Sequence, residues 1–219
     1  MTLKVYGVLQ ATFTQRVLVV LKEKNVSYEF ITVDWAGKTH KAPSYLLNHP
    51  FGQFPYIDDD GFILYESIAI MKYIALKYRD QGAPLLPDPG DLKATALMEQ
   101  ACSVEASNFN PFTTPIVIEK YGKPIRGVEP DEEVVKECVL GLDSKLDGYE
   151  LILAKQRYLA GDSITIADLA HLPTGTIISR VGVTLLEDFT KRPNVTRWWR
   201  EIYTRPSWQE VVASADAKI

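Results

Sequence analysis

The pattern of apolar residues changes abruptly around residues 80–90. Before this segment, short strand candidates alternate with helix candidates; after it, strand signals almost vanish and helical periodicity takes over. The segment has no periodicity and is rich in turn formers, namely Gly82, Pro84, Pro87, Pro89 and Gly90, which is typical of a linker. We therefore predict two domains, residues 1–80 and 91–219, joined by a linker at residues 81–90.

The first domain is predicted to have the element order βαβαββα. Its strand candidates are Leu3–Tyr6, Tyr28–Val33, Tyr56–Ile57 and Phe62–Leu64, and its helix candidates are Thr14–Lys24, Lys41–Asn48 and Glu66–Tyr78. A helix joins the first two strands, so they are expected to be parallel with a right-handed crossover. The last two strands flank Asp58-Asp59-Asp60-Gly61, a strong hairpin signal. An α/β fold follows for this domain.

The second domain is predicted to be all α-helical. Helical stripes cover residues 92–109, 131–154 and 194–203, an interrupted stripe runs from 110 to 121, residues 124–130 form a loop, and a short helix follows Pro206. Another helix is expected to begin at Thr165, because Thr165 and Asp168 have the spacing of a capping box. This spacing gives Asp168 a structural role and no catalytic one.

Composition narrows the class of protein. A hydrophobic content of 46% and a charged content of 24% are those of a folded globular chain. The net charge of −4 and the pI near 5.5 speak against nucleic acid as a partner. Val17–Leu21, among the longest apolar runs, is too short to span a bilayer, and no secretory signal is recognised. We expect a cytoplasmic protein that binds no membrane.

The cysteines give no support for a metal or a redox site. Cys102 and Cys138 both lie in predicted helices, and no CxxC motif or cluster of His and Cys occurs. We expect both thiols to be reduced and buried as small apolar groups. No metal site and no cofactor are predicted.

Several motifs together resemble one known family. They are the NHPFGQFP run at Asn48–Pro55, the Glu66-Ser67 pair at a helix start, the loop Gly7–Arg16, and the downstream runs Tyr158–Asp162 and Ile166–Leu169. In order and spacing they are similar to the cytosolic glutathione transferases, specifically the phi-type branch, over essentially the whole chain. The resemblance implies a thioredoxin-like N-terminal domain that binds glutathione and an all-helical C-terminal domain that supplies a hydrophobic substrate site.

The resemblance also implies a glutathione site. Pro55 is expected to follow a cis peptide bond, with the backbone of Phe54 pairing with the peptide-like ligand. Ser67 would hold the γ-glutamyl carboxylate at a helix N-terminus, and Glu66 would receive the ammonium group. The remaining glutathione-binding candidates are His40, Lys41 and Gln53. His49 has no role in the motif and is interpreted as a surface residue.

The loop after the first strand departs from the phi-type pattern. Ala11 occupies the position of the usual catalytic serine, and alanine has no hydroxyl to stabilise a thiolate. Thr12 is the candidate catalytic residue, Thr14 is interpreted as a helix cap, and backbone N–H groups at the helix start remain an alternative. Ile68 replaces an arginine that is common after the Glu-Ser pair. Weak activity is compatible with a loop in which Ala11 replaces the usual serine.

A hydrophobic co-substrate is expected to meet apolar side chains contributed by both domains. The candidates are Leu9, Phe13, Phe109, Phe112 and Ile116; the competing interpretation for such residues is simple core packing. Phe51 stands where related proteins insert an aromatic ring into a second subunit, so the resemblance implies a homodimer.

Three functions remain in competition. The leading hypothesis is a detoxifying transferase that conjugates glutathione, its co-substrate, to hydrophobic electrophiles. The second is a non-catalytic carrier (a ligandin) of hydrophobic aromatic metabolites, suggested by Ala11. The third, an interaction module, is disfavoured by the intact Gln53, Pro55, Glu66 and Ser67. The absence of loop cysteines excludes a dithiol oxidoreductase.

Overall fold

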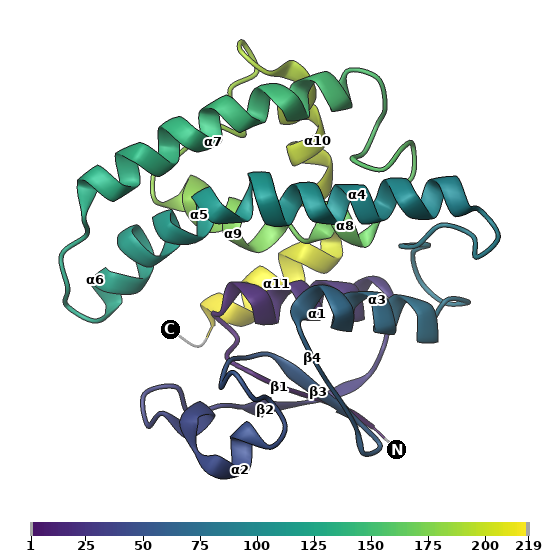
Figure 1. The fold of residues 1–219 in the computed structure, drawn as a ribbon, viewed down its shortest axis with the longest axis vertical. Helices are drawn as coiled ribbons and strands as arrows, with labels where there is room; N and C mark the ends of the chain where they lie inside the picture. Colours follow the sequence, from purple (N-terminus) through teal and green to yellow (C-terminus); the bar gives the residue numbers. More distant parts are fainter. Residues whose placement is uncertain (1, 218–219) are drawn as a thin grey trace. The chain divides into compact units, whose positions relative to one another are not determined.

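The computed structural model describes residues 2–217 and divides into two compact units. Unit 1 comprises the chain up to Leu86 together with the residues from Pro206 onward, and unit 2 comprises Pro87–Arg205 (Figure 1). The two ends of the chain thus belong to the same unit. The division after Leu86 lies inside the predicted linker at residues 81–90, whereas the helix after Pro206, predicted to belong to the second domain, is part of unit 1.

Unit 1 is built on a four-stranded mixed sheet. Its strands are β1 (Leu3–Gly7), β2 (Tyr28–Thr32), β3 (Tyr56–Asp59) and β4 (Phe62–Tyr65), in the order β2-β1-β3-β4. As predicted, β1 and β2 are parallel, with Val5 opposite Phe30, and β3 and β4 form an antiparallel hairpin. Val5 and Ile57 pair across β1 and β3 and are fully buried, so they mark the centre of the sheet.

Helices cover this sheet. Unit 1 contains α1 (Thr12–Glu23), the 3-10 turn η1 (Thr39–Lys41), α2 (Pro43–Leu46), α3 (Ser67–Lys77) and α11 (Pro206–Asp216). α1 packs against both α3 and α11. Figure 1 shows α1, α3 and α11 on one side of the sheet and α2 on the other. The thioredoxin-like arrangement expected from the resemblance is confirmed.

The described residues of unit 2 form helices and no strand. They are α4 (Leu92–Asn108), α5 (Asn110–Val117), the π-helical turn η2 (Ile118–Gly122), α6 (Lys123–Ile125), α7 (Glu132–Leu153), α8 (Ile166–Leu169), α9 (Leu172–Arg180) and α10 (Pro193–Tyr203). The predicted interruption near residue 110 separates α4 from α5. α6 extends to Ile125, into the segment 124–130 expected to be a loop, and α9 is a separate helix that the sequence did not predict.

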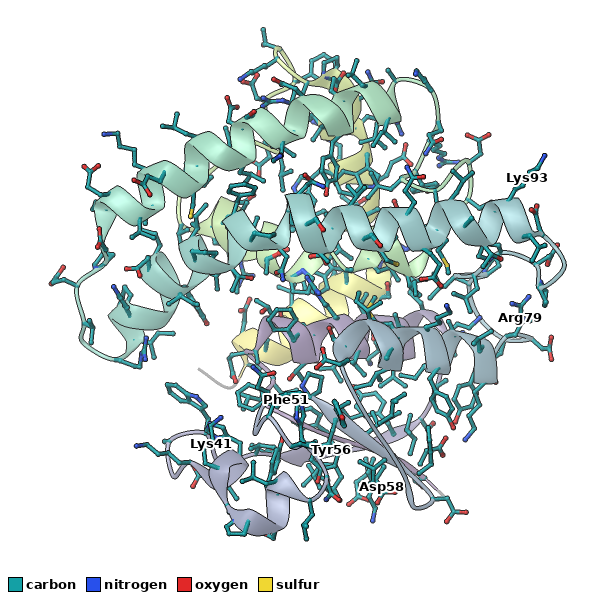
Figure 2. The ribbon with its side chains drawn as sticks, viewed as in Figure 1. Lys41, Phe51, Tyr56, Asp58, Arg79 and Lys93 are labelled. Atoms are coloured by element: carbon teal, nitrogen blue, oxygen red, sulfur yellow. The ribbon has the colours of Figure 1, made fainter. Side chains whose placement is uncertain are left out.

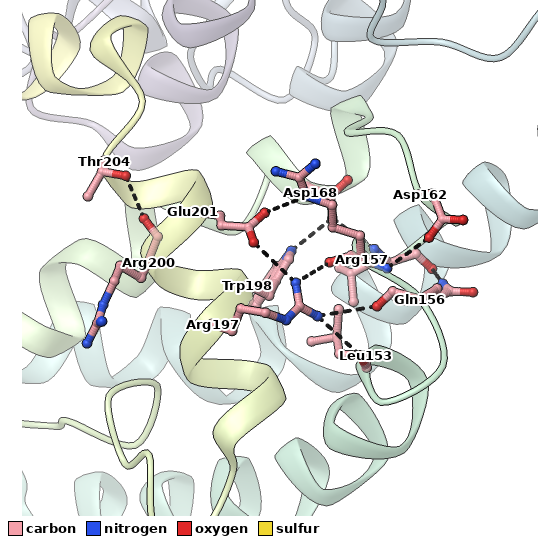
Figure 3. A network of polar contacts seen from close by, with 11 residues as sticks. Leu153, Gln156, Arg157, Asp162, Asp168, Arg197, Trp198, Arg200, Glu201 and Thr204 are labelled. Atoms are coloured by element: carbon pink, nitrogen blue, oxygen red, sulfur yellow. Dashed lines mark hydrogen bonds and ion pairs between the residues drawn. The ribbon is translucent and has the colours of Figure 1, made fainter.

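The capping box at the start of α8 is present. The Thr165 hydroxyl accepts a hydrogen bond from the Ala167 N–H, and the Asp168 carboxylate accepts from the Thr165 N–H at 2.9 Å. Asp168 is completely buried and also accepts from the Leu159 N–H at 3.0 Å. It accepts from Trp198 Nε1 at 2.9 Å as well (Figure 3). One carboxylate therefore joins α8, α10 and the segment between α7 and α8.

Two further observations concern the chain as a whole. Cys102 is buried as expected, whereas Cys138 is only half-buried, and neither residue forms a disulfide. Across residues 2–217, no helix is both long enough and apolar enough to cross a lipid bilayer.

Candidate functional site

The loop between β1 and α1 presents a helix N-terminus. β1 ends at Gly7 and α1 begins at Thr12, with Ala11 as the N-cap residue. A turn forms where the Ala11 N–H donates to the Val8 carbonyl at 3.0 Å, and the first helical hydrogen bond runs from the Gln15 N–H to the Ala11 carbonyl. Ala11 offers no side-chain cap, and the first turn carries no acidic residue. The open N–H groups and the positive end of the helix dipole therefore remain available to an anion.

The two threonines in the first turn of α1 differ in exposure. Thr12 is half-buried. Thr14 is completely buried, and its hydroxyl has no hydrogen-bond partner. Its side chain packs so closely on Gly7 that a Cβ there would lie 2.7 Å from the Thr14 hydroxyl oxygen. The interpretation of Thr14 as a helix cap is wrong, because the helix starts two residues earlier.

The segment before β3 offers a free backbone. The Phe54–Pro55 peptide bond is cis, as expected. Within residues 2–217, no group donates to or accepts from the backbone N–H and C=O of Phe54. The neighbouring Gln53 side chain is exposed, and the Gln53 carbonyl accepts a hydrogen bond from the Tyr45 hydroxyl at 2.7 Å. Tyr45 therefore fixes the segment from α2 while leaving the Phe54 backbone unoccupied.

A second helix N-terminus lies at the start of α3. Glu66 is the exposed N-cap residue, and Ser67 is the first residue of the helix, with 8% of its surface exposed. Glu66 adopts φ 71°, which is uncommon for a residue other than glycine and is found at ligand sites. No side chain caps the helix, and its first turn carries no acidic residue. A carboxylate ligand fits the charge and the free donors of this position.

η1 brings the candidates His40 and Lys41 to the same region. Lys41 is exposed, and its ammonium donates to the carbonyl of Gly52 at 2.6 Å and to that of Phe51 at 3.3 Å; it lies beside α2 (Figure 2). The His40 ring is buried and packs edge-on to Phe54, 5.7 Å between centroids. Burial lowers the pKa of His40, and the Lys41 charge lowers it further. The lowered pKa favours the neutral imidazole of His40 at neutral pH.

One apolar cluster joins these segments. Val33, Tyr45 and Tyr56 form its buried centre, and the side chains packed against it include Val8, Phe54 and Tyr65. Val8 belongs to the loop before α1, Phe54 precedes the cis proline, and Tyr65 precedes the Glu66-Ser67 pair. The cluster thus holds the loop before α1, the free Phe54 backbone and the start of α3 together within unit 1.

Some contributors to this region were not predicted. Tyr45 lies in a short helix that carries no motif; burial raises the pKa of its hydroxyl, which stays protonated and donates to Gln53. His49 is 2% exposed and stacks on Tyr65 with ring centroids 4.8 Å apart, so its interpretation as a surface residue is wrong. Tyr45 contacts Gln53 and His49 contacts Tyr65, and both partners lie outside the contacting residue's own helical turn. No spacing in the sequence indicates either contact.

The apolar candidates for a second ligand differ in exposure. In unit 1, Leu9 and Phe13 are half-buried, and the Arg16 guanidinium lies 4.7 Å from the Phe13 ring centroid. In unit 2, Phe109 and Ile116 have no exposed surface, and Phe109 packs on His171 with ring centroids 4.6 Å apart.

Phe112 is half-buried and fills the space that Gly141 leaves on α7, where an added Cβ would lie 2.3 Å from its ring. Within the candidate set, accessible surface therefore belongs to Leu9, Phe13 and Phe112. A role for the set in binding a second ligand stays a prediction. Among residues 2–217, no group of three or more His, Cys, Asp or Glu side chains is arranged to hold a metal ion.

Comparison with known proteins gives a consistent set of relatives. Residues 1–76 match the family model described as Glutathione S-transferase, N-terminal domain, and residues 109–206 match the corresponding C-terminal domain. A glutathione S-transferase of Arabidopsis thaliana is 44% identical over 200 residues, 90% of each chain.

Two solved structures are similar over nearly the whole length. A glutathione transferase from Populus trichocarpa has a TM-score of 0.91 at 37% identity, covering 98% of this chain and 99% of that one. Glutathione S-transferase I from maize, solved in complex with an atrazine glutathione conjugate, has a TM-score of 0.91 at 32% identity and covers 100% of both chains.

Proposed function

This chain belongs to the glutathione S-transferase family, and from that premise we propose that it transfers glutathione onto hydrophobic electrophiles. The transferase function is favoured over the other candidates because the free Phe54 backbone, the Ser67 helix start and the Thr12 helix start all border one cluster. Detoxification of reactive apolar compounds is the corresponding role. Glutathione is the co-substrate, and the reaction needs no cofactor.

Glutathione would be held at three points of unit 1. Its γ-glutamyl carboxylate is placed at the Ser67 hydroxyl and the α3 N-terminus, with its ammonium at Glu66. Its cysteinyl backbone pairs with the free N–H and C=O of Phe54, as an added strand does. Its glycyl carboxylate lies toward Lys41, with Gln53 and His40 contributing hydrogen bonds. The cysteinyl sulfur is then directed toward the start of α1.

Chemistry requires the sulfur as a thiolate. A free thiol has a pKa near 8.5, so only about 3% is ionised at pH 7. Lowering this pKa by about 2 units takes roughly 2.7 kcal/mol of preferential stabilisation. A hydroxyl that donates to a charged sulfur supplies about 1.5–3 kcal/mol. The Thr12 hydroxyl, assisted by the open N–H groups of α1, is therefore sufficient in principle.

The proposed reaction consists of deprotonation of the thiol and attack of the sulfur on the electrophile. The thiol proton leaves to water as the thiolate forms, and the sulfur lone pair attacks the electrophilic carbon to make the new C–S bond. The electron pair of the broken bond departs with the leaving group or, in an addition, moves onto the acceptor. Apolar surface at Leu9 and Phe13, in unit 1, would hold the electrophile near the sulfur.

The test is the pKa of bound glutathione, measured by thiolate ultraviolet absorbance against pH in wild type and Thr12→Val. We expect a depressed pKa in the wild type and a return toward the free value in the variant, with conjugation slowed in parallel. A depressed pKa that is unchanged in Thr12→Val would assign activation to the N–H groups of α1. Bound glutathione with a free-solution pKa and no conjugation would overturn the transferase proposal.

The carrier hypothesis rests on one observation, the missing hydroxyl at Ala11. It requires that large aromatic molecules bind well while bound glutathione keeps its solution pKa, so the same titration separates it from the transferase. The transferase is favoured because the similar maize enzyme was solved with a conjugate, the product of such a reaction.

Two further properties belong to the proposal. A homodimer is supported by Phe51, whose side chain is 65% exposed beside the glutathione site. A cytoplasmic location is supported by the two cysteines, which are free thiols, as is usual for proteins of reducing compartments.

A further inference from the structure

The last helix, α11, packs against α1. Polar contacts attach it to the end of α1 and to the loop before α1. At one end, Lys22 forms an ion pair with Glu210, 2.9 Å between Nζ and Oε2, and the Ser207 hydroxyl hydrogen-bonds to the Glu23 carboxylate. At the other end, Gln10 Nε2 donates to the Ala215 carbonyl at 3.2 Å. Because the start of α11 meets the end of α1 and its end meets the residues before α1, the two helices are antiparallel.

The apolar face of α11 adds to these polar contacts. Trp208, Val211 and Ala215 are spaced by three and four residues and are 0%, 2% and 5% exposed, so they form one buried stripe along the helix. Such a stripe fixes the helix along its length. The polar contacts then set its register relative to α1.

Gln10 connects α11 to the loop that carries Thr12. The loop is held from within by the bond from the Ala11 N–H to the Val8 carbonyl at 3.0 Å, and from α1 by Gln15 Nε2 donating to the Leu9 carbonyl at 2.9 Å. Gln10 supplies the third attachment, which reaches across 205 positions of the sequence. The backbone just before Ala11 is thereby fixed at Leu9 and Gln10 by two glutamine side chains.

The Ala215 carbonyl, which accepts the hydrogen bond from Gln10, has no donor within α11. Ala215 lies in the last turn of α11, which ends at Asp216. Carbonyls of the final turn have no intrahelical donor. The Gln10 amide therefore caps the C-terminus of α11 while it restrains the loop, and each end stabilises the other.

We propose that α11 positions the thiol-activating loop and that Gln10 is the positioning residue that makes the connection. The inference rests on the proposed function of that loop. Gln10 does not touch glutathione; it holds the backbone from which Thr12 and the first N–H groups of α1 meet the sulfur. Displacements of about 1 Å at such a site cost up to a hundredfold in rate.

The test compares Gln10→Ala, a chain ending at Ser214, and the two combined. Each single change should raise the pKa of bound glutathione and lower kcat about three- to tenfold, with KM for glutathione within twofold of wild type, since both ends of glutathione bind elsewhere. The combined variant should be no worse than the more affected single one, because both remove the same bond. Ser214→Ala is the matched control: this exposed side chain donates to the Glu210 carbonyl, within its own helix, and its replacement should change nothing.

Amide hydrogen exchange keeps the two proposals separable. Gln10→Ala should speed exchange both in residues 8–12 and in the last turn of α11, whether or not the protein conjugates glutathione. If exchange and the thiol pKa are both unchanged in Gln10→Ala, the positioning role is overturned, even when the shortened chain is too unstable to assay. If exchange changes as expected in a protein whose bound thiol keeps its solution pKa, the link from α11 to the loop stands and the transferase proposal fails.

Discussion

Ala11 occupies the position from which a side chain has the most influence on both the fold and the chemistry. Its backbone has φ −78° and ψ 127°, the extended conformation of an N-cap residue, yet its methyl group caps nothing. Serine in this conformation accepts a hydrogen bond from the second or third N–H of the helix through its oxygen. The hydroxyl proton of the same serine stays available to a sulfur anion.

Ala11→Ser should therefore raise both stability and activity. The new cap should add about 0.5–2 kcal/mol to the free energy of unfolding. The second donor to the thiolate should lower the pKa of bound glutathione further and increase the conjugation rate at pH 7. Thermal unfolding and the thiolate titration measure the two effects separately.

Comparing Thr12→Val in the wild-type and Ala11→Ser backgrounds shows which hydroxyl stabilises the thiolate. If the serine introduced by Ala11→Ser takes over activation, Thr12→Val should have a smaller effect in that background than in the wild-type background. A stabilised protein with an unchanged thiol pKa would mean that the Ala11 side chain points away from the sulfur, and would contradict the alignment of Ala11 with the family's serine.

At the residue scale, the sequence predicted the site residues that lie within motifs. It missed the side chains that connect one motif-bearing segment to another. Pro55, Glu66 and Ser67 stand in recognisable runs, and the structure places Pro55 after a cis bond and the pair at a helix start. Tyr45 and Gln10 make their contacts to backbone carbonyls across 8 and 205 positions. A glutamine or tyrosine that meets a distant carbonyl leaves no periodicity or spacing by which it could be recognised.

At the element scale, the buried Arg192 joins α7 to the start of α10. Its side chain is 1% exposed and forms ion pairs with Asp143 at 2.9 Å and with Asp147 at 2.7 Å. Lys191 adds a third cation–carboxylate contact, 2.7 Å from Asp143. The Lys191 ammonium and the Arg192 guanidinium hold the pKa of Asp143 below its ordinary value of 3.8. The ionised form of Asp143 is thus bound in the folded state.

This shift gives stability a defined pH dependence. A carboxylate whose pKa is lower in the folded state contributes stability above its unfolded pKa and loses it as the pH falls through the folded value. Asp143→Asn should cost about 1.5–3 kcal/mol at pH 7, the range for a hydrogen bond to a charged group. The difference from wild type should shrink as the pH falls below about 3.8.

Denaturant unfolding between pH 7 and pH 3 measures this difference, with Glu137→Gln as the control. Glu137 is an exposed carboxylate on the same helix, and its neutralisation should change stability little at any pH. A cost of Asp143→Asn that stays constant down to pH 3 would show that the amide is disruptive for steric reasons and that the ion pair contributes nothing.

Elements that carry their own start signal were predictable, and those defined by packing were not. The spacing of Thr165 and Asp168 predicts the start of α8. No pattern in the sequence predicts the hydrogen bond from Trp198 to Asp168. α9 follows α8 after only two residues and lacks a side-chain cap at His171, so no capping signal marks where α9 begins. The membership of α11 in unit 1 depends on contacts with α1 that no linker or composition change marks.

At the scale of the whole molecule, the most exposed aromatic side chain beside the candidate site is that of Phe51. It is 65% exposed, and its ring packs edge-on to His49 and Tyr65, with centroids 6.3 and 6.2 Å away. The Lys41 ammonium holds the Phe51 carbonyl from the other side at 3.3 Å. A rigidly supported, exposed aromatic ring has the properties of an interface anchor.

Phe51→Ser should therefore weaken the proposed homodimer. Aromatic anchors contribute about 2–4 kcal/mol when truncated, which corresponds to a dissociation constant raised about 30- to 1000-fold. Light scattering coupled to size exclusion over a range of concentrations measures the change. Phe189→Ser is the matched control, because Phe189 is equally exposed at 65% but lies in unit 2, between α9 and α10, and its loss should leave the dimer intact.

The monomer produced in this way also tests whether the site is self-contained. The residues proposed to hold glutathione all lie in unit 1, so monomeric Phe51→Ser should bind glutathione by calorimetry. Affinity within about tenfold of wild type would agree with this arrangement. A wild-type chain that is monomeric at every concentration, or a Phe51→Ser variant that dimerises as tightly as wild type, would contradict the role of Phe51 and leave its exposed ring as surface only.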